Sequence, residues 1–169
     1  MLFRSVRVMS TNPSYLQSTT DVEVRNYRDW GIALGRRFRS LKVWFNLREQ
    51  GAEAIRQKLR RDMANAKWLE SQIRSTPAWR VVAPVTLQTV CIRHEPAGLA
   101  AQSLDAHTRR WAQAVNDSGD AYLTASIADG RWMVRVSIGA ALTESHHVQA
   151  LWRIMQNAAA ASAALTCSA

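Results

Sequence analysis

Cysteine is scarce in this chain, whose 169 residues contain only Cys91 and Cys167. Two cysteines cannot build the disulfide framework that stabilises small secreted domains, and neither lies at a metal-ligand spacing from other candidate ligands. The sequence therefore excludes a disulfide-rich scaffold and a zinc module. A reducing cytoplasm is the compartment that we expect.

Long apolar runs are missing as well. No stretch reaches the roughly 20 apolar residues that a membrane-spanning helix requires, so we expect no membrane partner. The first residues, Met1–Ser5, contain no apolar centre of a signal peptide and look like an arbitrary beginning. No repeating unit is present, and the only compositional bias is an alanine-rich end.

Acidic residues are fewer than basic ones, since 13 Asp and Glu stand against 22 Lys and Arg, which gives a net charge of +9. This charge would permit binding to nucleic acid or to an anionic surface. The arginines are nevertheless spread over predicted helices and strands, and the aromatic and basic pattern of an RNA-binding sheet is absent. We therefore expect a basic surface that faces an acidic or phosphate-bearing partner rather than nucleic acid.

The content of 47% hydrophobic and 21% charged residues is typical of a soluble domain with a real core. Two helices are predicted first. One follows Gly35, with Phe38, Leu41 and Phe45 at spacings of three and four. The second begins at Ala52 and ends before Pro77, and its apolar stripe comprises Ala52, Ile55, Leu59, Met63, Ala66, Leu69 and Ile73. Lys58 and the arginines of this helix are assigned to a solvated face.

From Trp79 onward the apolar period changes to two, which indicates strands. We predict strands at 79–82, 87–93, 122–126 and 132–138, with a turn at 128–130. A helix capped by Ser103 is expected between the second and third strands, and a last helix capped by Thr143 follows the fourth. This order predicts an α+β domain in which helices pack on one face of a largely antiparallel sheet, preceded by a loop and a long helix.

Cations crowd the start of the first helix, where Arg36, Arg37, Arg39 and Lys42 follow Gly35. The helix dipole disfavours positive charge in this position. These side chains are therefore expected to meet an anion, a carboxylate partner or another subunit, unless they simply form a solvated face.

Arg135 lies between Val134 and Val136, so strand alternation places it on the face opposite to the valines, with Met133 and Ser137. An arginine in this position either caps a sheet edge or binds an anion. The four histidines, His94, His107, His146 and His147, show no ligand spacing to a carboxylate or cysteine, and capping or surface roles are expected for them.

The segments 27–30 (Tyr-Arg-Asp-Trp) and 34–44 carry a resemblance to a known family. They resemble the pyridoxal-phosphate-dependent group II amino-acid decarboxylases, and in particular the aromatic-L-amino-acid decarboxylase branch. The likeness extends from about Val6 almost to the last helix. It implies the C-terminal small domain of a fold-type I enzyme. Residues 1–35 would then form a catalytic loop and connecting segment, and residues 36–169 the C-terminal α+β domain.

The same resemblance implies conversion of aromatic L-amino acids to amines and carbon dioxide by a homodimer that uses pyridoxal 5'-phosphate. It implies that Tyr15 donates a proton to the substrate α-carbon and that Gly35 forms part of the substrate pocket. Arg28 and Arg135 would support the loop or the cofactor side. A phenol suits proton donation because it stays neutral at pH 7.

The cofactor's attachment lysine has no counterpart in this sequence. Lys42, Lys58 and Lys67 all fall on predicted helices, and none stands in an Asn-x-His-Lys context. In the family this lysine precedes the region that the chain covers. We therefore expect a fragment that is inactive by itself.

Two alternatives remain open. A non-catalytic basic module that binds nucleic acid or protein would also explain the net charge of +9. A decarboxylase-like remnant that only dimerises, or that regulates a full-length partner, would explain the absent lysine.

Overall fold

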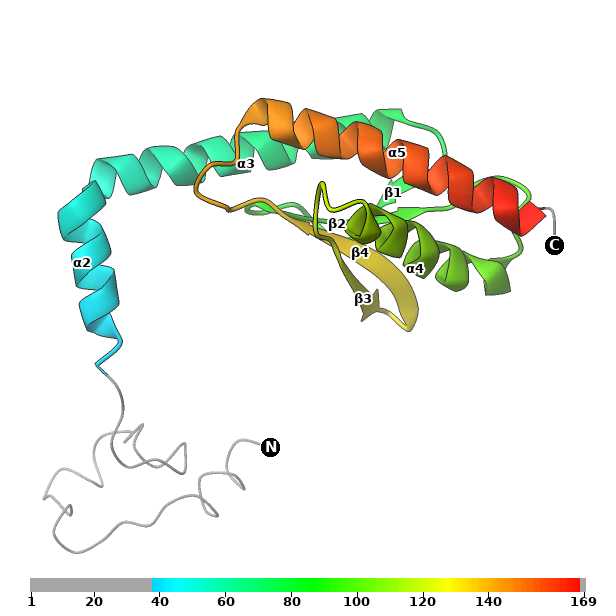
Figure 1. Ribbon diagram of the computed structural model, residues 1–169, viewed down its shortest axis with the longest axis horizontal. Helices are drawn as coiled ribbons and strands as arrows, with labels where there is room; N and C mark the ends of the chain where they lie inside the picture. Colours follow the sequence, from blue (N-terminus) through cyan, green and yellow to red (C-terminus); the bar gives the residue numbers. More distant parts are fainter. Residues whose placement is uncertain (1–37, 168–169) are drawn as a thin grey trace, which may run out of the picture. The chain divides into compact units, whose positions relative to one another are not determined.

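The computed structural model describes residues 38–167, which belong to two separate units, 38–49 and 50–167. Its helices and strands follow one another in the predicted order, and the α+β class is confirmed (Figure 1). They are α2 (Ser40–Gln50), α3 (Ala52–Ser75), β1 (Trp79–Val81), β2 (Thr89–His94), α4 (Ala101–Asp117), β3 (Thr124–Ala128), β4 (Arg131–Ser137) and α5 (Ser145–Cys167).

The four strands form one antiparallel sheet with the order β1-β2-β4-β3. The β3–β4 hairpin turns at Asp129 and Gly130, whose φ angles are 52° and 73°. Positive φ at both central residues is the geometry of a type I′ turn, and it suits an Asp-Gly pair. The predicted turn at 128–130 is therefore confirmed, and it places β4 between β2 and β3.

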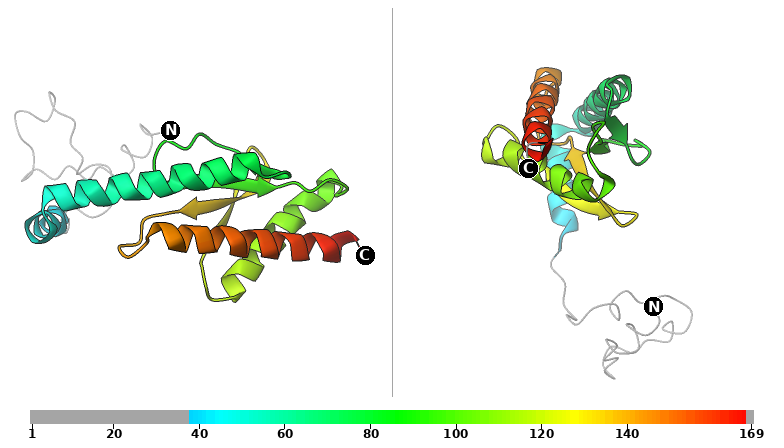
Figure 2. Two further views of the ribbon diagram at one scale, coloured as in Figure 1. Left: turned by 90° about the horizontal axis from the view of Figure 1, so that it is seen from above. Right: turned by 90° about the vertical axis from the view of Figure 1, so that its right-hand side faces the viewer.

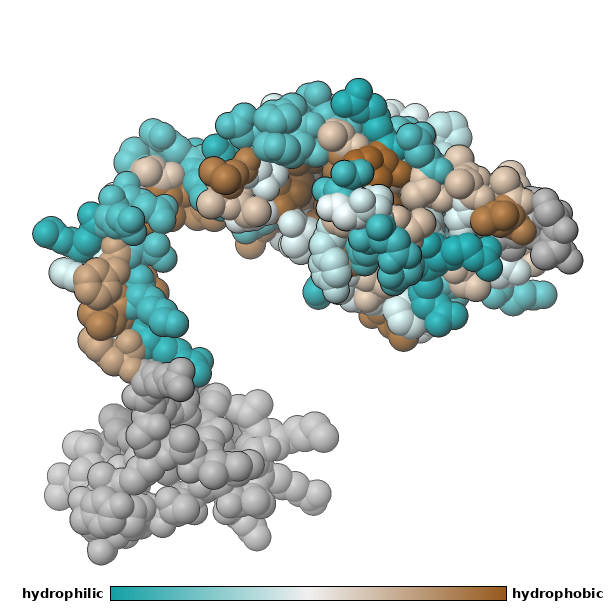
Figure 3. All heavy atoms as spheres, in the orientation of Figure 1, coloured by the Kyte–Doolittle hydropathy of each residue, from teal (hydrophilic) through white to brown (hydrophobic). Residues whose placement is uncertain are grey.

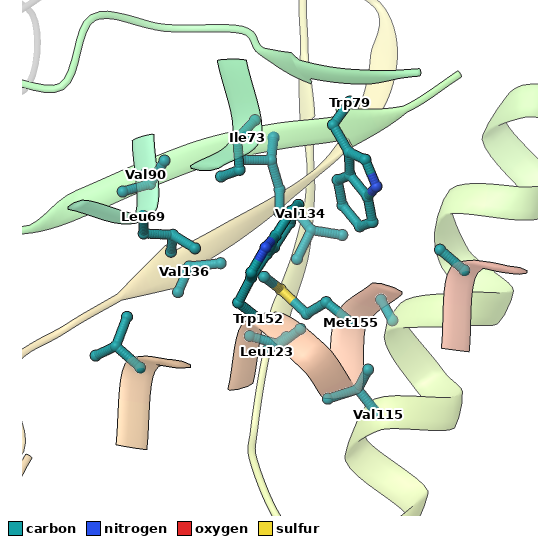
Figure 4. Close-up of a cluster of buried hydrophobic side chains, with 14 of the residues drawn as sticks. Leu69, Ile73, Trp79, Val90, Val115, Leu123, Val134, Val136, Trp152 and Met155 are labelled. Atoms are coloured by element: carbon teal, nitrogen blue, oxygen red, sulfur yellow. The ribbon is translucent and has the colours of Figure 1, made fainter. Parts of the chain in front are cut away.

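One face of this sheet and the helices α3, α4 and α5 enclose a single core (Figures 2 and 4). Val90, Ile92, Val134 and Val136 come from the two central strands and are at most 2% exposed. The Trp79 ring joins the layers, since its centroid lies 5.5 Å from that of Trp111 on α4 and 4.9 Å from that of Trp152 on α5. Edge-to-face contacts of this kind add to the stabilisation from burial.

Helix α3 is packed only over its second half, which corrects the predicted apolar stripe. Leu69 and Ile73 are fully buried, whereas Leu59 is 44% exposed. The first half is instead tied down by polar contacts. Lys58 Nζ donates to Asp62 Oδ2 at 2.8 Å and to the Gly139 carbonyl at 2.9 Å, and Arg61 donates to the Ala141 carbonyl at 3.2 Å. Lys58 is therefore a structural residue rather than part of a solvated face.

The bounds of all four strands and of the last two helices differ slightly from those predicted. Three of the starts have a local explanation. Helix α4 begins at Ala101, ahead of Ser103, because the extended backbone of Ala100 (ψ 144°) already precedes a helical turn. Strand β3 begins two residues late because the Asn116 amide occupies both backbone groups of Leu123, at 2.6 and 3.0 Å. Helix α5 begins at Ser145, two residues after Thr143, and the Glu144 N–H at its start donates to His147 Nδ1.

Helix α2, taken by itself, buries none of its residues. Phe38, Leu41, Trp44 and Phe45 are between 42% and 73% exposed, although they recur at the predicted spacing. Figure 3 shows hydrophobic surface along one side of α2 and hydrophilic surface along another. The Arg48 guanidinium lies 5.7 Å from the Trp44 ring centroid, within the range of a cation–π contact.

Two histidines lie in the core, contrary to the capping and surface roles that were predicted for them. His94 Nδ1 and His107 Nε2 are 2.9 Å apart, and the exposed fractions of the two residues are 9% and 0%. Burial lowers the pKa of His94 to about 4, and the nearby His107 acts in the same direction. Burial also lowers the pKa of His107, and Arg110 contributes. The pair is therefore neutral in the folded chain, with one ring nitrogen donating to the other.

Substitutions at one buried and one exposed leucine of α3 test whether only the second half of this helix is packed against the core. Leu69→Ala should lower the free energy of unfolding by about 2–5 kcal/mol because it leaves a cavity in the core. Leu59→Ala, at an exposed position of the same helix, should change it by less than about 0.5 kcal/mol. Urea denaturation followed by circular dichroism measures both values. Equal losses would contradict the half-packed description of α3.

The histidine pair predicts a pH dependence of stability. Between pH 6.5 and about 4 the unfolded chain binds more protons than the folded chain, so the free energy of unfolding should fall as the pH falls through this window. His94→Asn keeps a side-chain nitrogen or oxygen near His107 but removes one titrating group. The free energy of unfolding of this variant should therefore vary less with pH. His146→Gln removes a histidine at an exposed position and is the control. Thermal melts at several pH values provide the measurement, and an identical slope in His94→Asn and the wild type would refute the assignment.

Candidate functional site

The second face of the sheet is not covered by α3, α4 or α5, and we call it the open face. Strand alternation defines it, because Val90, Ile92 and His94 of β2 are buried on the helical side. The cross-strand register then places eleven residues on the open face. They are Arg80, Thr89, Cys91, Arg93, Thr124, Ser126, Ala128, Arg131, Met133, Arg135 and Ser137.

Arg135 lies near the middle of the open face, as the alternation predicted. Its Cα pairs with Cys91 of β2 on one side and with Thr124 of β3 on the other. The residue is exposed, and its side chain forms no hydrogen bond or ion pair with any residue of the described range. Its neighbour Met133 shares the face but is only 7% exposed. The arginine therefore does not cap a sheet edge, which leaves anion binding as its predicted role.

Three further arginines share this face, and they were not singled out from the sequence. Arg80 pairs with Arg93 directly across β1 and β2. Arg93 donates to the carbonyls of Trp132, Ala128 and Arg131, at 3.0, 3.0 and 3.4 Å. Arg131 lies 3.3 Å from the Glu95 carboxylate. The positions of Arg80 and Arg93 on this face could have been predicted from the sequence, because each stands between two inward-facing residues of a short strand.

The other three residues of the predicted site, Tyr15, Arg28 and Gly35, lie outside the described residues. The boundary predicted between residues 35 and 36 lies there too. The structure therefore places only Arg135 of the predicted set, and its relation to the other three stays a prediction.

An apolar groove of about 470 Å³ lies beside the start of α5. Its floor includes Leu123, Val136, Ile138 and Val148, and its rim includes Asp120 and His147. No lysine or arginine lines it. A phosphate-bearing ligand needs donors or positive charge, so this groove does not suit one.

The lysines also lack the setting that a pyridoxal phosphate group requires. Lys58 is held by Asp62 and Gly139, while Lys42 and Lys67 are exposed on helices. The residues described in this chain therefore do not form a site for that cofactor.

Two other classes of site are absent from residues 38–167. No cluster of three or more His, Cys, Asp or Glu side chains that could hold a metal ion occurs in this range. None of its helices is long and apolar enough to cross a bilayer.

Comparison with known proteins agrees with the fold. The model of the pyridoxal-dependent decarboxylase conserved domain matches residues 5–95. The aromatic-L-amino-acid decarboxylase of Catharanthus roseus is 35% identical over 154 residues, which cover 89% of this chain and 30% of the relative. The L-tyrosine/L-DOPA decarboxylase 2 of Lophophora williamsii is 35% identical over 176 residues, which cover 92% of this chain and 34% of the relative.

Solved structures show the same relationship. Catharanthus roseus tryptophan decarboxylase in complex with L-tryptophan superposes with a TM-score of 0.70 at 34% identity, covering 93% of this chain and 33% of that one. For Rhodiola rosea 4-hydroxyphenylacetaldehyde synthase the TM-score is 0.69 at 31% identity, covering 83% and 30%.

This chain thus spans about a third of the length of the relatives that it matches. The family model covers more than half of its residues, and the four-stranded sheet with helices on one face matches the C-terminal domain of fold-type I enzymes. The chain belongs to the pyridoxal-dependent decarboxylase family.

Proposed function

We propose that this chain supplies the C-terminal part of a decarboxylase that converts aromatic L-amino acids to amines and carbon dioxide. The observation that carries the proposal is the match over about nine tenths of the chain to relatives named as decarboxylases of tryptophan, tyrosine or DOPA. The substrate class follows these names.

Pyridoxal 5'-phosphate is the cofactor that we propose for the complete enzyme, where it would accept the electrons left by the departing carboxylate. We propose that a lysine in another part of the complete enzyme holds it, and the settings of the described lysines support this proposal. We further propose a cytoplasmic homodimer.

Four residues of this chain are proposed to act in the complete enzyme. Tyr15 would donate a proton from its phenol oxygen to the substrate α-carbon, and Gly35 would leave room for a bulky aromatic ring in the substrate pocket. Arg28 and Arg135 would support the closed state. The exposed guanidinium of Arg135 on the open face is compatible with this role, because no described residue neutralises it.

A comparison of the chain alone with a hybrid enzyme tests whether decarboxylation requires a part of the enzyme outside this chain. Purified residues 1–169 with added pyridoxal phosphate should release no carbon dioxide from L-tryptophan. A hybrid that joins the chain to the part of the Catharanthus roseus decarboxylase outside the matched region should release it. Carbon dioxide release by the chain alone would contradict the proposal. So would an inactive hybrid that is soluble, dimeric and shows the visible absorbance of the bound cofactor.

Two tyrosines of the hybrid test the proton donor. Tyr15→Phe removes the phenol but keeps the ring, and it should lower the rate of amine formation by about a hundredfold or more, as expected for the loss of a general acid. Tyr122→Phe makes the same change at a position that is 84% exposed in this chain and should have little effect. Chromatography of amine and aldehyde products measures both. An unchanged amine yield in Tyr15→Phe would remove Tyr15 from the mechanism.

A further inference from the structure

The apolar groove beside the start of α5 is not used in the proposed function. Its volume of about 470 Å³ falls within the range of pockets that hold small molecules, roughly 300–1,000 Å³. Nine of the fourteen residues that line it are alanine, valine, leucine or isoleucine, and they come from β4, from α5 and from the segments beside β3 and β4. The groove therefore suits a ligand with an apolar body.

The charge inside the groove has one sign. Asp120 is the one lining residue that carries a full charge. It is exposed, and its carboxylate forms no hydrogen bond or ion pair with the residues that the structure describes. The lining also includes Ser137 and Thr143, whose hydroxyl oxygens can accept hydrogen bonds. A protonated amine would therefore meet a carboxylate and further acceptors here.

The neighbouring helix ends agree with this sign. Helix α4 ends at Asp117, shortly before Asp120, and has no basic residue in its last turn. The C-terminal end of a helix favours cations. The positive end of α5 also borders the groove, but Glu144 stands directly before this helix and offsets it. Lys58 and Arg61 reach the loop beside the groove from α3, yet neither lines it.

This lining distinguishes an aromatic amine from the amino acid that gives rise to it. Decarboxylation leaves the ring and the amine in place and removes only the carboxylate. The carboxylate of an amino acid would enter the groove without a cationic partner, and an unpaired charge is costly to remove from water. The groove therefore favours the product class of the proposed reaction over its substrate class.

We propose that the groove binds aromatic monoamines, with Asp120 pairing with the ammonium group and the apolar walls from β4 and α5 packing against the ring. The chemical class of the ligand rests on the proposed function, because aromatic amines are the product of that reaction. The site itself lies within the described part of this chain, and binding there requires no pyridoxal phosphate.

Tryptamine serves as the probe, and isothermal titration calorimetry measures its affinity for residues 1–169 without pyridoxal phosphate. L-Tryptophan, which differs only by its carboxylate, should bind about tenfold more weakly or not at all. Asp120→Asn keeps the size of the side chain but removes its charge. It should weaken tryptamine binding by about fivefold, the upper end of the effect of losing a solvent-exposed ion pair.

Asp129→Asn is the matched control. It removes one carboxylate from the β3–β4 turn, outside the groove, and asparagine tolerates the positive φ of 52° at this position. The affinity for tryptamine should change by less than about twofold. Ala150→Phe, in contrast, fills the groove with a ring and should abolish the binding. Circular dichroism checks that each variant is folded.

Tryptamine binding that is weakened in Asp120→Asn and retained in Asp129→Asn would support the proposal. It would be overturned if the folded chain bound no tryptamine, if L-tryptophan bound equally well, or if both aspartate variants lost affinity to the same extent. Undiminished binding in folded Ala150→Phe would also overturn it. An inactive hybrid enzyme would contradict the proposed function without affecting these titrations, so the two proposals fail separately.

Discussion

The packing of Trp79 against Trp111 and Trp152 is the contact on which the rest of the domain depends. It joins the edge strand β1 to two helices that are distant in the sequence, and the His94 ring lies 4.7 Å from it on the neighbouring strand. Because these aromatic groups all gather on one side of the sheet, α3, α4 and α5 form a single layer there. The opposite side of the sheet carries mostly polar residues, and the distribution of charge follows from this one-sided core.

The sequence predicted the order of the elements because apolar periods of two and of three to four are local properties of the chain. The sequence-based prediction failed where a contact from a distant residue determines where an element begins or what holds it in place. The Asn116 amide sets the start of β3 across a turn, and the carbonyls of Gly139 and Ala141 fix the first half of α3. Leu59 has the spacing of a core residue, but no helix or strand among residues 38–167 packs over it and buries it. Periodicity shows which face could be buried, and only the fold shows how much of it is.

The candidate site was predictable to different degrees. Strand alternation was sufficient to assign Arg135 to the face opposite Val134 and Val136, because neighbouring residues of a strand point to opposite sides. The grouping of Arg135 with Arg80 and Arg93 required the order of the strands, which depends on the connections through α4 and the hairpin. The buried histidine pair joins residues 94 and 107, and no spacing rule for ligands describes two rings that meet by hydrogen bonding. The roles of Tyr15 and Gly35 rest on family resemblance alone.

The polar attachment of the first half of α3 has a consequence for local opening. The second half of the helix is held by Leu69 and Ile73 in the core, so its amide hydrogens are released only when the domain unfolds. The first half is held by Lys58 and Arg61 to a loop, and such contacts are broken at a much smaller cost than a packed core. We therefore expect two segments of unequal protection within one continuous helix, and the loop that leads into α5 should be released together with the weaker one.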